Sequence, residues 1–155
     1  MSNLPSHSSG LVFHHVGHAV REIPAIAERY CRSFGYVVES PIVHDRLQTA
    51  SVQFLRLPGA TSWLEFVAPD GPESKLASTV SKRGGLHHLC FTSGPLDETV
   101  THLEDGGFVL FSQPRPAAAF DGRRICWLMS EDFSLIELVE RRSETDSCEP
   151  VSSIP

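Results

Sequence analysis

The chain has 155 residues, of which 41% are hydrophobic, and a formal net charge of -6. This size suits one domain, the hydrophobic fraction is too high for a disordered chain, and the negative charge argues against a duplex nucleic-acid partner. No apolar run reaches the roughly 18 residues that a bilayer span requires, and residues 1–10 lack the basic and apolar regions of a signal peptide. We therefore expect a cytoplasmic protein with no nucleic-acid or membrane partner, whose four scattered cysteines are free thiols.

The first half of the chain predicts a strand, then a helix, then two or three more strands. Pro24 suits the first turn of the helix and Gly35 suits its end. The Pro58-Gly59 pair marks a turn between the last two strands. The expected strands are residues 12–20, 36–39, 51–57 and 62–67.

The second half predicts the same order of elements. A short linker helix that carries Leu76 and Val80 separates it from the first half. Gly106 and Gly107 end the helix expected at residues 95–104. The strands expected around this helix are residues 87–92, 108–112, 124–129 and 135–139.

An internal repeat joins the two halves. FHHVGHAV at 13–20 returns as LHHLCFTS at 86–93, and WLEFVAP at 63–69 returns as LIELVER at 135–141. Matched residue types at matched spacing indicate a duplicated βαβββ unit. The predicted organisation is a disordered tail at 1–10, a first module at 11–70, a linker helix at 71–85, a second module at 86–141 and a disordered tail at 142–155.

The repeat brings out one pair of metal-ligand types twice. His15 is followed by Glu65, and His88 is followed by Glu137, at nearly equal separations. Each glutamate alternates with apolar neighbours along its strand, so its carboxylate faces away from the helix layer, where a charge is costly unless a cation or solvent compensates it. Four such residues at repeat-related positions predict a divalent metal site with two nitrogen and two oxygen ligands. Strict strand alternation puts His14 and His87 on the opposite face, and we interpret both as structural.

These residues resemble the vicinal oxygen chelate superfamily, which includes glyoxalase I, extradiol dioxygenases, fosfomycin and bleomycin resistance proteins and methylmalonyl-CoA epimerases. The resemblance is strongest to the epimerases and spans about residues 11–141. It implies an α+β fold in which two βαβββ modules form a cup-shaped mixed sheet, with His15, Glu65, His88 and Glu137 as the metal ligands. The segments that carry it are HHVGHAV, YCRSFGY, LEFVAP, ESKLASTVSKRGGLHHLCF, QPRP and LIELVE.

Two loops depart from the epimerase pattern. PAAAFDGRR follows the QPRP motif and MSEDFS precedes the last strand, and both differ from the epimerase loops that shape the acyl-thioester pocket. A further glutamate that some epimerases carry on the third strand corresponds to Val52. Six basic residues could meet a phosphate or carboxylate of the substrate, and Arg123 with Arg124 is the pair that we predict to bind it. The other four are Lys75, Lys82, Arg83 and Arg115.

The resemblance implies an epimerase or isomerase that acts on a 2-substituted acyl thioester, carried on CoA or a carrier protein. We also expect a homodimer, because modules of this family often pair between chains. The cofactor would be a divalent ion such as Co²⁺, Ni²⁺, Mn²⁺ or Zn²⁺. It would stabilise the enolate that forms when a proton leaves the α-carbon. Glu65 and Glu137 would act as the catalytic acid and base on opposite faces of the substrate.

Three other classes of function stay open. A glyoxalase I-type lyase would use the same four ligands on a glutathione hemithioacetal. An extradiol dioxygenase normally has two histidines and one carboxylate, and Glu65 in a fourth ligand position argues against it. A drug-binding resistance protein would need no metal, which the four ligand positions disfavour.

Overall fold

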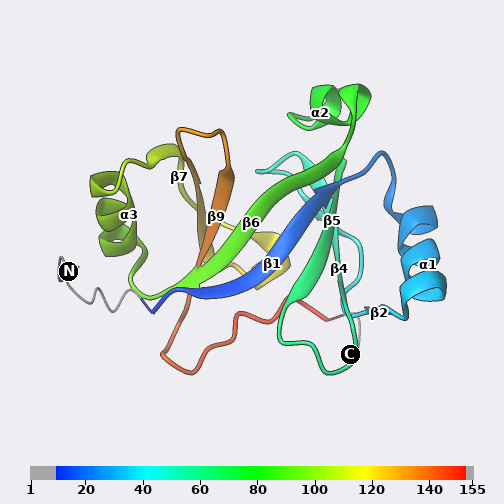
Figure 1. Ribbon diagram of the computed structural model, residues 1–155, viewed down its shortest axis with the longest axis horizontal. Coiled ribbons are helices and arrows are strands. Elements are labelled where there is room, and N and C mark those ends of the chain that lie inside the picture. The colour runs from blue at the N-terminus through cyan, green and yellow to red at the C-terminus, as the bar shows by residue number, and fades with distance from the viewer. Residues whose placement is uncertain (1–9, 153–155) are drawn as a thin grey trace.

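The computed structural model describes residues 10–152 and shows one mixed β-sheet with helices at its two ends (Figure 1). The helices are α1 (Ile23–Phe34), α2 (Ala77–Lys82), α3 (Leu96–Asp105) and a 3₁₀ turn, η1 (Ala118–Phe120). The strands are β1 (Val12–Ala19), β2 (Val37–Val38), β3 (Val43–Asp45), β4 (Ala50–Arg56), β5 (Trp63–Pro69), β6 (Gly85–Ser93), β7 (Val109–Pro116), β8 (Arg124–Met129) and β9 (Leu135–Glu140). Among residues 10–152, no helix is long and apolar enough to cross a bilayer.

The order of the strands displays the duplication. It runs β2-β4-β5-β1-β6-β9-β8-β7, with β3 beside β4. β1 and β6 are antiparallel neighbours at the centre, β5 lies parallel to β1, and β9 lies parallel to β6. The predicted α+β fold is therefore confirmed, and the central pair of strands joins its two halves. Strand β3 and turn η1 were not predicted.

Helices α1 and α3 cover the outer face of the sheet, one over each half. Ile23 and Ala27 of α1 pack with Phe66 of β5. Leu96 of α3 packs with Leu138 of β9. Since successive side chains of a strand point to opposite faces, the residue before each of these strand positions points to the other face, which we call the inner face.

Two β-bulges interrupt the alternation in the central strands. Between the pairs Phe13–Phe91 and His15–Cys90, β1 has one extra residue, which is His14. Between Gly17–His88 and His18–Leu86, β6 has one extra residue, His87. A bulge turns two adjacent side chains toward one face. The prediction that His14 lies on the opposite face from His15 was therefore wrong, and its ring contacts Trp63 and Phe120 on the inner face.

The segment after β9 packs against the fold. Cys148 is fully buried, and the backbone N–H of Val151 donates to the carbonyl of Ala119 at 2.9 Å. The expectation of a disordered tail from residue 142 does not describe residues 142–152, because their polar and charged groups find partners in η1, in the loop before β8 and on β1. The tail expected at 1–10 lies outside the described residues, apart from Gly10.

Candidate metal centre

Four side chains from four strands meet on the inner face of the sheet. His15 of β1 and His88 of β6 place their Nε2 atoms 3.0 Å apart. Oε1 of Glu65, from β5, lies 3.4 Å from Nε2 of His88 and 3.7 Å from Nε2 of His15. Oε1 of Glu137, from β9, lies 3.4 Å from Nε2 of His15 and 3.9 Å from Nε2 of His88. Donors that share one cation at bond lengths of about 2.0–2.2 Å are separated by such distances.

The four side chains are almost completely buried. Exposed fractions of the side chains are 0% for His15 and His88, 4% for Glu65 and 5% for Glu137. Oε1 of Glu137 is buried without a hydrogen-bond partner among the described residues. Burial raises the pKa of both carboxyl groups and lowers the pKa of both imidazoles. An unpartnered carboxylate oxygen beside two buried imidazole nitrogens is costly alone, and a divalent cation would compensate it.

Gly17 makes room for one of the histidines. A Cβ atom at this position would lie 2.0 Å from Cε1 of His88, so any side chain there would displace the imidazole ring. Cys90 occupies the corresponding position in the second half and is fully buried. The close approach of β1 to the His88 ring is a packing feature that the histidine spacing alone does not reveal.

The histidines that precede the two candidate ligands form an outer layer of contacts. Nδ1 of His14 lies 2.7 Å from Nδ1 of His15, and Nδ1 of His87 lies 2.7 Å from Nδ1 of His88. Each candidate ligand thus contacts its neighbour through Nδ1 and directs Nε2 to the centre. Burial lowers the pKa of His14 to about 4, so this ring is neutral at physiological pH.

A cavity of about 380 Å³ lies over the two carboxylates. Its volume is in the range of small-molecule sites. Glu65 and Glu137 line it, and Lys75 is the only lysine or arginine in its lining within residues 10–152. The rest of the lining is mainly apolar and includes Val52, Val67, Leu76, Ala117, Ala119, Phe120, Ile125, Trp127, Met129 and Leu135.

The sequence analysis missed several lining residues, and three of them make polar contacts beside the cavity. Indole Nε1–H of Trp127 donates to Oε1 of Gln48 at 3.2 Å, which ties the two halves together beside the cavity. Asp45 accepts hydrogen bonds from the backbone N–H groups of Gln48 and Ala118, and so anchors β3 to η1. These residues are far apart in sequence, and no motif or repeat connects them.

The two arginines predicted to bind substrate lie elsewhere. Arg123 forms a two-pronged ion pair with Asp146, with N–O distances of 2.8 and 3.0 Å. Arg124 pairs with Glu140 and Asp97. Neither arginine lines the cavity, so the structure assigns their charges to ion pairs within the chain. The acidic partners of both arginines are many residues away in the sequence, so the loop sequence did not reveal them.

Known proteins share both the fold and part of the sequence. An ethylmalonyl-CoA/methylmalonyl-CoA epimerase of Cereibacter sphaeroides is 27% identical over 128 residues, which cover 80% of this chain and 93% of the relative. The crystal structure of methylmalonyl-CoA epimerase from Mycobacterium tuberculosis is 27% identical, with a TM-score of 0.70 and coverage of 85% of this chain and 89% of that one. A methylmalonyl-CoA epimerase of Streptomyces coelicolor in complex with 2-nitronate-propionyl-CoA is 23% identical, with a TM-score of 0.68 and coverage of 84% and 97%.

One known family matches most of this chain. The family described as the glyoxalase/bleomycin resistance protein/dioxygenase superfamily matches residues 14–127, which include three of the four candidate ligands. The chain belongs to this superfamily.

Proposed function

We propose that the protein is a divalent-metal-dependent epimerase that acts on a 2-substituted acyl thioester of the methylmalonyl-CoA type. The observation that carries the proposal is the position of two buried carboxylates beside two imidazoles at the base of a largely apolar cavity. The epimerase relatives support the same reaction class.

His15, Glu65, His88 and Glu137 would hold the cation. Mixed nitrogen and oxygen donors suit Co²⁺, Ni²⁺, Mn²⁺ or Zn²⁺. When bound, such an ion supplies electrostatic stabilisation to the negative charge that develops on a carbonyl oxygen as an α proton is removed.

The two glutamates would carry out the proton transfers. Glu65 comes from β5 and Glu137 from β9, on opposite sides of the central strands. One carboxylate can therefore accept the α proton while the other donates a proton to the opposite face of the same carbon. In the metal-free protein, burial raises the pKa of both carboxyl groups, which is the direction that favours uptake of a proton.

The lining of the cavity suits the acyl part of such a substrate. The apolar walls would exclude water from the reacting carbon, which strengthens the electrostatic contacts made there. Lys75 offers the one cationic side chain in the described lining, and we assign it to a carboxylate or phosphate of the substrate.

A glyoxalase-type lyase would use the same ligands, and formation of lactoylglutathione from methylglyoxal and glutathione would identify it. The relatives described above are epimerases, which favours the first assignment. A dioxygenase is disfavoured by the fourth protein donor, and a metal-free binding protein by the orphaned buried oxygen of Glu137.

Exchange of the substrate α proton tests the proposal. The protein, loaded with each of the four metals, is incubated with methylmalonyl-CoA or ethylmalonyl-CoA in D₂O, and loss of the α-proton signal is followed by NMR. We expect exchange of both epimers with the wild type, and in Glu137→Gln a loss of about 10²–10⁴-fold for the epimer whose α proton faces Glu137, because the amide cannot accept that proton. Metal analysis should show that Glu137→Gln still binds the ion through its amide oxygen.

The matched control is Glu140→Gln. Glu140 lies on the same strand as Glu137, but its carboxylate pairs with Arg124 outside the cavity. This variant should exchange at the wild-type rate. Full exchange in Glu137→Gln would remove Glu137 from the mechanism, and no exchange by the wild type with any of the metals would refute the epimerase assignment.

A further inference from the structure

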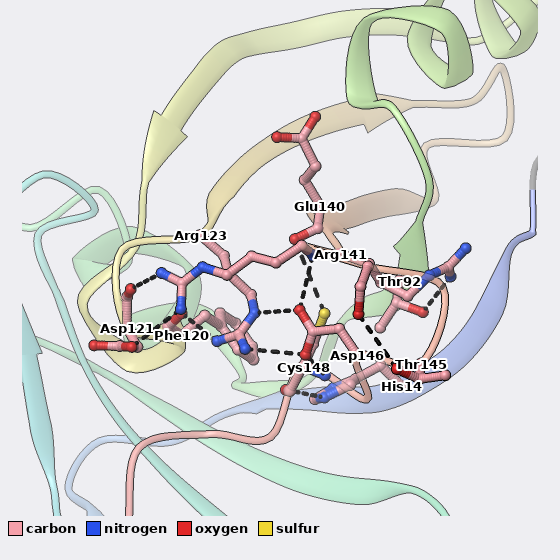
Figure 2. A network of polar contacts seen from close by, with 12 residues as sticks. His14, Thr92, Phe120, Asp121, Arg123, Glu140, Arg141, Thr145, Asp146 and Cys148 are labelled. Atoms are coloured by element: carbon pink, nitrogen blue, oxygen red, sulfur yellow. Dashed lines mark hydrogen bonds and ion pairs between the residues drawn. The ribbon is translucent and has the colours of Figure 1, made fainter.

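A chain of polar contacts runs from the C-terminal segment to the candidate metal centre, and Figure 2 shows its part from Asp146 and Cys148 to His14. The carbonyl oxygen of Cys148 lies 2.9 Å from Nε2 of His14. Nδ1 of the same ring lies 2.7 Å from Nδ1 of His15. Nε2 of His15 in turn faces the two glutamates at the centre. A segment more than 130 residues away in sequence is thereby linked to a candidate metal ligand.

The chemistry of these groups fixes the direction of each hydrogen bond. A carbonyl oxygen only accepts, so Nε2–H of His14 must donate to Cys148. A neutral imidazole carries one N–H, which leaves Nδ1 of His14 as an acceptor for Nδ1–H of His15. The free lone pair of His15 is then on Nε2, the nitrogen that faces the centre. This tautomer is the one that a cation at the centre requires.

The backbone of the C-terminal segment is itself held firmly in place. Asp146 receives two hydrogen bonds from Arg123 and accepts the backbone N–H groups of Arg142 and Cys148 (Figure 2). Cys148 adopts a left-handed backbone conformation, with φ of 52°, and its side chain is buried. The carbonyl of Cys148 is therefore aimed by the ion pair between Asp146 and Arg123.

The packing around His14 also favours a single ring position. Its imidazole stacks on Trp63, with ring centroids 4.6 Å apart and an angle of 20° between the planes. Phe54 and Phe120 contact the ring edge-on. The ring is thus restrained by aromatic contacts, while its two nitrogens are left to the carbonyl and to His15.

We propose that the segment 142–152 is a positioning element for the metal centre, in which the Cys148 carbonyl acts through His14 to hold His15 in the tautomer that binds a cation. His14 is a positioning residue, and Arg123 and Asp146 orient the segment that supports it. The inference rests on the metal site of the proposed function. The second half lacks this support, since the ring of His87 lines the cavity and no backbone carbonyl within residues 10–152 is hydrogen-bonded to it.

Two variants interrupt the chain of contacts at different points. His14→Phe keeps the aromatic packing and removes both hydrogen bonds. Asp146→Ala removes the ion pair that orients the carbonyl and leaves every residue of the centre intact. Asp97→Ala is the matched control, because Asp97 pairs with the neighbouring Arg124 and not with Cys148, His14 or Asp146.

The affinity for Co²⁺, measured by competition with a chelating indicator, is the first readout. Loss of a group that orients a ligand typically lowers metal affinity about 10–100-fold. We expect a loss of that size in His14→Phe, a smaller loss in Asp146→Ala and no change beyond twofold in Asp97→Ala. Circular dichroism of the metal-free variants checks that each is folded.

The tautomer of His15 is the second readout. Long-range ¹H–¹⁵N correlation spectra of the metal-free protein should show the proton on Nδ1 of His15 in the wild type and in Asp97→Ala, and a mixture of tautomers in His14→Phe. A purely structural role of His14 would change stability without this spectral change.

The outcomes separate the inference from the proposed function. If His14→Phe and Asp146→Ala bind Co²⁺ as tightly as the wild type, the inference is overturned and the proposed metal centre is not affected. A wild type that binds none of the divalent ions would overturn both.

Discussion

At the scale of single residues, the candidate site depends on a glycine, Gly17, whose lack of a side chain leaves room for a histidine ring. Gly17 lies directly against the imidazole of His88, and its Cα is paired with that of His88 across the central strands. Its counterpart in the second half is Cys90, so the repeat is not symmetrical at this position. The ring of His88 uses the space that the missing side chain leaves.

Gly17→Ala should therefore displace His88. The added Cβ would lie 2.0 Å from Cε1 of the ring, a separation that requires the ring to move. We expect Co²⁺ affinity to fall by about tenfold or more, as for loss of a group that orients a ligand. The same measurement on Gly59→Ala, an exposed position where no atom lies within 4 Å of the added Cβ, should give an affinity within a few-fold of wild type. Equal affinities for Gly17→Ala and wild type would show that His88 is not a ligand in this position.

Adjacent residues of like charge can have unrelated roles. Arg123 and Arg124 were predicted together as substrate-binding residues, yet each is neutralised by a carboxylate of the chain itself. The partner of Arg123 is Asp146. This aspartate lies in the C-terminal segment, which we expected from the sequence to be disordered. The two predictions are linked, because without an ordered segment Arg123 had no visible partner in the sequence.

At the scale of the elements, helix α1 shows how far local rules reach. Pro24 lies in its first turn and Gly35 follows its last, as expected from the sequence. The backbone N–H of Gly35 donates to the carbonyl of Cys31 at 3.1 Å, with φ of 78° at Gly35. A left-handed residue of this kind ends a helix by satisfying one of its last carbonyl groups.

Gly35→Ala should lower the free energy of unfolding by about 1 kcal/mol, the usual cost of a left-handed conformation for an L-residue with a side chain. No atom lies within 4 Å of the added Cβ, so this cost is conformational and not steric. Thermal unfolding should show a melting temperature lower by about 2–4 °C. Ser33→Ala, an exposed position inside the same helix, serves as the control and should shift it less. A stability equal to wild type would mean that the helix end tolerates another conformation.

The alternation of side chains along a strand did not predict the bulges in β1 and β6. Alternation predicted that only one histidine of each His-His pair would face the centre, whereas the extra residue in each strand brings both to the inner face. Bulges depend on how two strands pair, and the pairing of β1 with β6 joins residues more than 70 positions apart. Their result is an outer histidine next to each candidate ligand.

At the scale of the whole molecule, the chain closes on itself through the C-terminal segment. This segment runs from the end of β9 beneath the central strands (Figure 1) and reaches His14 near the start of the chain. Asp146 is the residue that holds it, and hydrogen bonds from Arg123 keep the pKa of its carboxyl well below the ordinary value of 3.8.

Acidification should release this segment. A carboxyl whose pKa is lowered by folding contributes stability above its ordinary pKa, and the contribution is lost as the pH falls from about 4 toward the lowered value. Urea unfolding of wild type and Asp146→Asn between pH 3 and 7 should show a difference in unfolding free energy that is constant above pH 5 and shrinks below pH 4. The buried glutamates titrate in both proteins and cancel in this difference. If the difference in unfolding free energy is the same at every pH, the ionisation of Asp146 does not contribute to the stability of the fold.

The sequence by itself determined the repeated unit, the superfamily and the set of four candidate ligands. These follow from residue type and spacing within each module, as with His15 and Glu65, and a duplication displays them twice. Strand parity predicted that Glu65 and Glu137 lie on the face opposite the apolar residues that pack on the helices. The structure has both glutamates on this inner face.

Only the tertiary structure decided what surrounds those four residues. The positions of His14, Gln48, Trp127 and Asp146 depend on contacts between segments that are distant in the chain. Propensity and periodicity describe neighbours along the chain, and they carry no information on which backbone carbonyl will meet which side chain. The set of candidate ligands could therefore be derived from the sequence, whereas the contacts of His14 with His15 and the walls of the cavity required the fold.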